Sequence, residues 1–78
     1  MISVSRKDLE LVALQEIRSF PGGELVLAVE VECDEDLPGV TNWRLDVTAA
    51  DGADIDRIEY AARTTTKRLK DRYVLQQH

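Results

Sequence analysis

The sequence predicts a small α+β domain in which two amphipathic helices cover an antiparallel β-hairpin, in the chain order αββα. Apolar residues recur every three or four positions near both ends of the chain, which indicates helices. Between them, apolar and polar residues alternate, which indicates strands. Pro21-Gly22-Gly23, the polar run 34–41 and Asp51-Gly52 separate the periodic segments. With 78 residues the chain makes one domain, residues 1–78.

The first helix is predicted from about Ser5 to Ser19. Ser5 is a suitable N-cap, and Asp8 three residues later completes a capping-box pattern. Pro21 prevents continuation, and Gly22 suits a left-handed helix stop. The residues expected to form the buried stripe are Leu9, Val12, Ala13, Ile17 and Phe20.

The hairpin is predicted from two strands, Glu24 to Cys33 and Asn42 to Ala49, within residues 24–50. The face expected to pack against the helices carries Leu25, Leu27, Val29, Val31 and Cys33, with Trp43, Leu45, Val47 and Ala49. The face expected to lie outside carries Val26, Ala28, Glu30 and Glu32. Arg44 shares this outer face, so it is expected to pair with the two glutamates.

The second helix is predicted from about Asp54 to Tyr73. Acidic residues gather at its start and basic residues at its end, which complements the helix dipole. Its predicted stripe includes Ile55, Ile58, Ala62 and Leu69. Residues 73–76 either finish this helix or form a short edge strand. A possible third strand therefore comes from the C-terminal tail or from a second subunit.

The residue content argues against an enzyme, a metal site or a cofactor site. Cys33 is the only cysteine, which excludes an internal disulfide and fits a reducing cytoplasm. We expect this thiol to be a buried structural residue. His78 is the only histidine and the last residue, a poor place for a catalytic base. Acidic residues cluster between Glu30 and Asp36, but their spacing does not match a calcium-binding loop, so we expect them to be solvated.

The outer face of the hairpin favours a protein-interaction module without enzymatic activity. Small domains bury little surface, so they often gain stability from a second subunit. Unpaired strand edges also invite strand addition. We therefore expect a homodimer that binds another protein, with Val26, Ala28, Glu30 and Glu32 as partner-binding residues. No segment is apolar enough to span a membrane, and we expect a cytoplasmic protein.

Nucleic-acid binding is the alternative function. The end of the second helix carries Arg63, Lys67, Arg68, Lys70 and Arg72. Basic residues at three- and four-residue spacing share a helix face and can contact phosphates. The same residues complement the helix dipole without any ligand, and the net charge of −5 opposes bulk attraction to nucleic acid.

Overall fold

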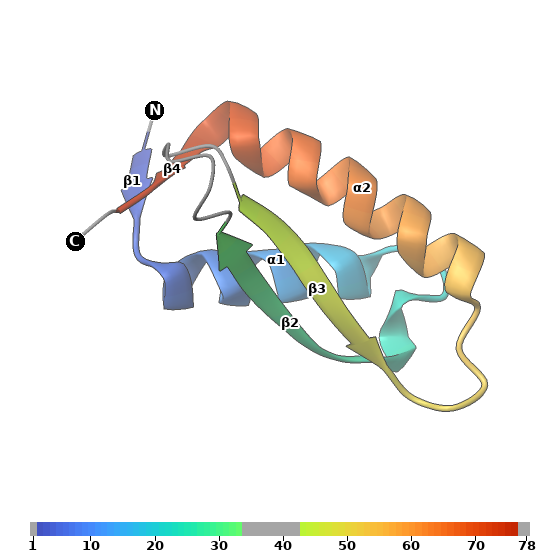
Figure 1. Cartoon of the computed structure of the whole chain (residues 1–78). Helices are drawn as coiled ribbons and strands as arrows, with labels where there is room; N and C mark the ends of the chain where they lie inside the picture. Colours follow the sequence, from blue (N-terminus) through green and yellow to red (C-terminus); the bar gives the residue numbers. More distant parts are fainter. Residues whose placement is uncertain (1, 34–42, 77–78) are drawn as a thin grey trace.

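The structure, a computed structural model, describes residues 2–33 and 43–76. Two helices and two separate pairs of strands follow the order β1, α1, η1, β2, β3, α2, β4. The α+β class predicted from the sequence is confirmed. The αββα order is incomplete, because a strand precedes the first helix and another follows the second. In Figure 1 the β2–β3 ribbon crosses α1, and α2 runs alongside.

The first helix, α1 (Arg6–Ser19), begins at Ser5, whose hydroxyl accepts a hydrogen bond from the Asp8 amide at 3.2 Å. Its buried residues are Leu9, Ala13 and Ile17, three members of the predicted stripe. Gly22 has a φ of 87° beyond the helix end, a conformation that glycine adopts readily. A Cβ on Gly23 would lie 1.9 Å from the carbonyl oxygen of Ile17. Both glycines are therefore required by the tight return of the chain.

That return leads through a short 3₁₀ turn, η1 (Gly23–Leu25), into β2 (Val26–Cys33), which pairs antiparallel with β3 (Trp43–Ala49). The register places Glu32 opposite Arg44 and Glu30 opposite Asp46. The polar run 34–41 that separates the two predicted strands lies outside the described residues. A bulge interrupts the ladder between Val26 and Ala28.

Because of the bulge, the first residues of β2 face the opposite way from the sequence prediction. An extra residue in one strand shifts the alternation of side chains by one position. Consequently Val26, expected on the outer face, is 1% exposed, whereas Leu27, expected in the core, is 63% exposed. Beyond the bulge, Val29 and Val31 are buried as expected. Cys33, expected in the core, is exposed at the strand end.

The second helix, α2 (Ile55–Arg72), begins after Asp54, whose carboxylate accepts a hydrogen bond from the Arg57 amide at 3.2 Å. Ile58, Ala61, Thr65 and Leu69 are buried, while Ile55, expected in the stripe, is exposed. One hydrophobic core contains the apolar members of this set, Ile58, Ala61 and Leu69, with the buried residues of α1 and with Val26, Val29, Val31, Trp43 and Leu75. None of the described helices is long and apolar enough to cross a membrane.

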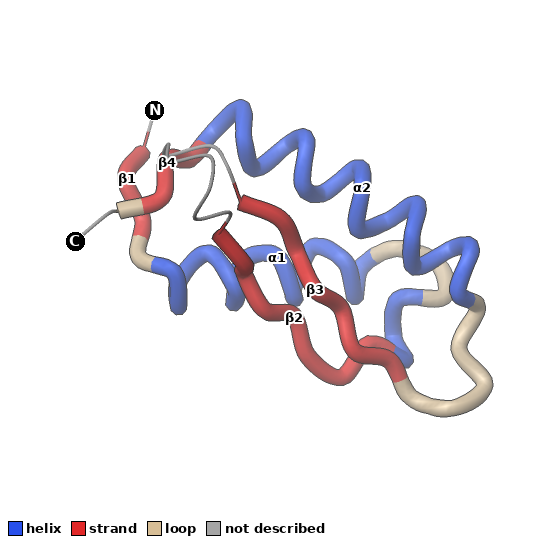
Figure 2. The backbone as a smooth tube through the Cα atoms, viewed as in Figure 1, coloured by secondary structure: helices blue, strands red, loops and turns tan. Residues whose placement is uncertain are grey.

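The two ends of the described chain form a strand pair of their own. Strand β1 (Ile2–Val4) pairs in parallel with β4 (Tyr73–Leu75). The tail is thus a strand, one of the two predicted possibilities, but it pairs with the N-terminal segment instead of extending the hairpin. Gln76 continues this contact by donating its amide to the carbonyl of Val4 at 2.8 Å. Figure 2 shows this small pair at one end of the molecule, beside the α2 terminus.

Candidate interaction site

The outer edge of β3 borders an apolar hollow. Within residues 2–33 and 43–76, β3 pairs only with β2, so its other edge carries no strand. The hollow lies between β3 and the first half of α2. Its lining residues are Leu45, Val47, Ala49, Ile55, Ile58, Glu59 and Ala62. The α2 members recur at three- and four-residue spacing, so a helix stripe runs along the open strand.

The main-chain groups of Leu45 point toward this open edge. In an antiparallel ladder, residues opposite each other either exchange both hydrogen bonds or direct both sets of groups away from each other. Val31 lies opposite Leu45, and its amide and carbonyl bond to side chains of α1 instead of to β3. Val31 and Leu45 are therefore a non-hydrogen-bonded pair. Beyond the other end of β3, the amide of Ala50 donates to the carbonyl of Leu25 at 2.9 Å. Every second residue counted back from Ala50 therefore faces β2, and Leu45 again faces the open edge.

The outer edge of β2 is guarded at Val31. Glu10 accepts a hydrogen bond from the Val31 amide at 2.7 Å. Arg6, one helical turn earlier, donates its Nε to the Val31 carbonyl at 3.0 Å. These two side chains occupy the donor and acceptor that a neighbouring strand would use. They also line a polar hollow with Glu30, Glu32 and Cys33. Strand addition at Val31 would have to displace both side chains.

The predicted partner-binding residues do not share one face. Ala28 and Glu30 are exposed, and Glu32 is half-buried. Val26 lies in the core, so its side chain is not available to a partner. The bulge at Leu27 explains this difference, because the sequence pattern assumes an unbroken pleat. Leu27 takes the exposed position instead.

The exposed face of the ribbon concentrates negative charge. Carboxylate oxygens of Glu30, Glu32 and Asp46 all lie within 4.8 Å of one another. Arg44 contacts Glu32 at 3.1 Å. Glu30 and Asp46 are directly opposite each other in the ladder, an arrangement that destabilises a sheet. Asp34, Glu35 and Asp36, which belong to the same acidic run, lie outside the described residues.

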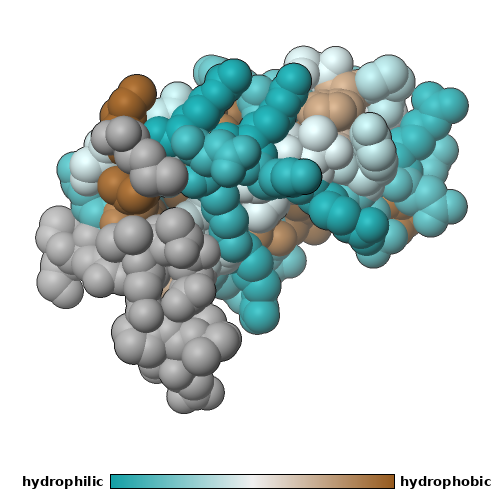
Figure 3. All heavy atoms as spheres, turned by 90° about the horizontal axis from the view of Figure 1, so that it is seen from above, coloured by the Kyte–Doolittle hydropathy of each residue, from teal (hydrophilic) through white to brown (hydrophobic). Residues whose placement is uncertain are grey.

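The predicted basic residues lie in the second half of α2. Arg63, Lys67, Arg68 and Arg72 are exposed, and Lys70 is half-buried. Among the described residues, two of the five contact other side chains. Arg68 reaches Glu16 of α1 at 3.4 Å, and the ammonium of Lys70 lies 5.2 Å from the centre of the Trp43 ring. Seen from above, where α2 lies nearest the viewer, hydrophilic side chains cover much of the surface (Figure 3).

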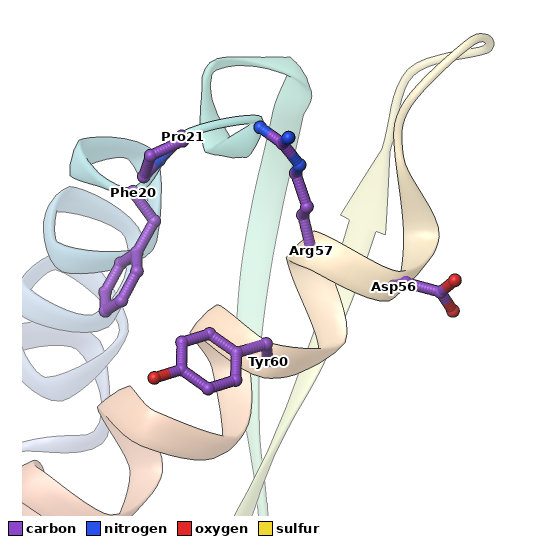
Figure 4. A pocket seen from close by; sticks show the side chains of 5 residues that line it. All are labelled: Phe20, Pro21, Asp56, Arg57 and Tyr60. Atoms are coloured by element: carbon purple, nitrogen blue, oxygen red, sulfur yellow. The ribbon is translucent and has the colours of Figure 1, made fainter.

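A third hollow lies where α1 ends and α2 begins. Its lining residues are Phe20, Pro21, Asp56, Arg57 and Tyr60. Phe20 and Tyr60 meet edge to face, with ring centroids 6.4 Å apart. In Figure 4 both rings flank the gap, while Asp56 points away from it. This contact joins the end of α1 to the start of α2. Phe20 is half-buried and also packs against the core.

Sequence reasoning missed the guard on β2 and the hollow beside β3. Arg6 and Glu10 read as ordinary surface residues of an amphipathic helix, and only their position beside Val31 gives them a role. The hollow could not be predicted from the sequence, because it depends on how β3 and α2 are placed relative to each other. Its one sequence signal is Ile55, an apolar residue that extends the α2 stripe beyond the buried core. His78, considered as a catalytic base, lies outside the described residues.

Comparisons with protein-family models, with curated proteins and with solved structures find no match to this chain.

Proposed function

We propose that this chain is a non-enzymatic protein-interaction module that assembles by adding a strand to the open edge of β3. The observation that carries the proposal is the contrast between the edges. Side chains of α1 satisfy Val31 on β2, whereas the main-chain groups of Leu45 face outward on β3. Strand addition supplies main-chain hydrogen bonds, and pockets beside the edge supply specificity.

The hollow beside β3 supports this function. A strand added to the edge would place every second side chain on the face shared with Leu45 and Val47. Those side chains would enter the space lined by Ile55, Ile58 and Ala62 of α2. Burial there would remove exposed apolar surface such as Ile55 from water. The proposed product is a homodimer, and the proposed location is the cytoplasm, where the exposed thiol of Cys33 remains reduced.

The wild-type chain tests this proposal without substitution. Sedimentation equilibrium from micromolar to millimolar concentration should show a monomer–dimer equilibrium. Amide hydrogen exchange, followed by NMR over the same range, should become slower at Leu45 and Val47 as the dimer forms. The Val31 amide should be protected at every concentration, since Glu10 accepts its hydrogen bond within the chain. A monomer throughout, or a dimer in which the Leu45 amide stays unprotected, would overturn the proposal.

Nucleic-acid binding is the second candidate function. Its supporting observation is that Arg63 and Lys67 are exposed one helical turn apart on α2. Arg68 and Lys70 support it less, because both already contact other side chains. A salt-dependent mobility shift that Lys67→Glu with Arg68→Glu abolishes would favour it. The absence of binding to DNA or RNA at low salt would reject it.

A further inference from the structure

We infer that the strand added to β3 is β3 of a second copy of this chain, antiparallel, with Leu45 opposite Leu45 and Arg44 opposite Asp46. This inference rests on the proposed function and specifies its partner and register. The resulting sheet would run β2, β3, then β3 and β2 of the second copy. A two-fold axis perpendicular to the sheet would pass beside Leu45.

The sequence around Leu45 is self-complementary about that residue. On the exposed face, Arg44 precedes Leu45 and Asp46 follows it, so an antiparallel copy sets each arginine opposite an aspartate. On the helix-facing side, Trp43 and Val47 flank Leu45, so apolar residues also meet apolar residues. The charge pattern around Leu45 is therefore complementary to its own antiparallel copy, which suits pairing of this strand with itself.

The hydrogen-bonding pattern agrees with this register. Since Val31 and Leu45 are a non-hydrogen-bonded pair, Leu45 directs its amide and carbonyl toward the open edge. Trp43 and Val47, two positions away on either side, direct theirs the same way. Leu45 would therefore exchange both hydrogen bonds with Leu45 of the second copy, and Trp43 would do so with the second copy's Val47.

The acidic cluster selects this register over its neighbour. Moving the pairing by two residues in one direction would keep the hydrogen-bond pattern but set Asp46 opposite Asp46 of the second copy, and moving it in the other direction would set Arg44 opposite Arg44. Asp46 already lies opposite Glu30, and its carboxylate lies within 4.8 Å of Glu30 and Glu32. Another carboxylate there would add repulsion, whereas the second copy's Arg44 would offset it. Arg44 in turn has 78% of its side chain exposed, so it can reach across the new strand pair.

Charge exchange tests the register directly. Arg44→Asp alone sets aspartate opposite aspartate at both ends of the pair, and Asp46→Arg alone sets arginine opposite arginine. Each single variant should raise the dimer dissociation constant about tenfold or more. Mixing the two variants restores opposite charges at both positions, so a heterodimer should form with roughly wild-type affinity. The double variant Arg44→Asp with Asp46→Arg should form homodimers again.

Cysteine cross-linking gives a second measurement that does not depend on charge. In a Cys33→Ser background, Leu45→Cys should form a disulfide-linked dimer under mild oxidation, because paired residues lie about 5.5 Å apart, within disulfide range. Val47→Cys is the matched control. Its two copies would be four residues out of register, about 13 Å apart, and should not cross-link.

The outcomes separate the register from the proposed function. A wild-type dimer that survives Arg44→Asp, or that cross-links through Asp46→Cys but not through Leu45→Cys, would overturn the register and leave strand addition at β3 intact. A wild-type chain that stays monomeric would overturn both. Loss of both single-variant dimers with recovery in the mixture would support the register.

Discussion

The two outer edges of the β2–β3 ribbon differ in how the chain treats their main-chain groups. On β2, Arg6 and Glu10 hold the carbonyl and the amide of Val31 at 3.0 Å and 2.7 Å. On β3, the groups of Leu45 face an apolar hollow bordered by α2. Open strand edges favour uncontrolled association, and natural proteins commonly block them. Among the described residues, the β2 edge is blocked at Val31 and the β3 edge carries no strand, so the strand addition that we propose is confined to β3.

The difference also shows how little sequence is needed to guard an edge. Arg6 and Glu10 are four residues apart on α1, so both project from the same side of the helix. One supplies donors and the other supplies acceptors, which together imitate the groups of a neighbouring strand. No residue of α2 is placed in this way toward β3 in the part of the chain that the structure describes. The residues that border β3 on α2 are mainly apolar.

Proline substitution in β3 should distinguish the edge that pairs with β2 from the open edge, and it should give the largest change in stability. Asp46→Pro removes an amide directed toward β2, leaves a carbonyl of β2 unpaired, and should destabilise the fold by about 3 kcal/mol. Val47→Pro removes an amide directed outward but also part of a half-buried side chain, so the monomer should lose about 1–2 kcal/mol while the dimer is lost. Urea unfolding and sedimentation measure the two effects. Equal destabilisation by both prolines would contradict the assigned strand orientation.

Removing the guard on β2 should produce the next largest effect. Glu10→Ala leaves the Val31 amide without its carboxylate acceptor and should lower the free energy of unfolding by about 1.5–3 kcal/mol. Because a second edge is then open, larger oligomers should appear beside the dimer. Glu10→Gln retains an acceptor oxygen and should keep most of the stability. Gln15→Ala, an exposed site on the same helix, is the control; if Glu10→Ala behaves like it, Glu10 does not guard the edge.

The bulge at the start of β2 gives a third test, since it decides which residues lie beneath the ribbon and which remain outside. Val26→Ala should cost about 2 kcal/mol, because two buried methyl groups are lost and a cavity remains. Leu27→Ala should change the free energy of unfolding by less than about 0.5 kcal/mol, because Leu27 is 63% exposed. Chemical denaturation of the two variants compares them directly. The unbroken pleat expected from the sequence requires the reverse order.

Periodicity and capping signals predicted much of the fold. The start of α1 at Ser5, the buried residues Leu9, Ala13 and Ile17, and the start of α2 after Asp54 all follow from local rules. The bulge did not follow from them, because Leu25, Val26 and Leu27 are all apolar and fit either alternation. The β1–β4 pair was missed because it joins two three-residue strands from opposite ends of the chain, too short for any period to be visible.

The candidate site was predictable only in its general nature. The sequence indicated a ribbon with open edges and an acidic outer face. It could not distinguish the β2 edge from the β3 edge, since that difference depends on where α1 places Arg6 and Glu10. The face assignment placed Val26 with Glu30, and the structure separates them. Long-range placement, which no local pattern encodes, decided the first point, and the bulge in β2 decided the second.

The smallest effect should come from relieving the acidic cluster, and it links the monomer to the proposed dimer. Glu30→Gln removes one of two like charges directly opposite in the ladder. In the monomeric Val47→Pro background it should stabilise the fold by about 0.5 kcal/mol at low ionic strength, and less at high salt. In the wild-type dimer the gain should shrink, because the second copy's Arg44 already offsets the charge of Asp46. A double-mutant cycle measures this difference, with Glu24→Gln as an exposed control on η1. An equal gain in both backgrounds would show that no positive charge reaches the cluster across the β3 edge.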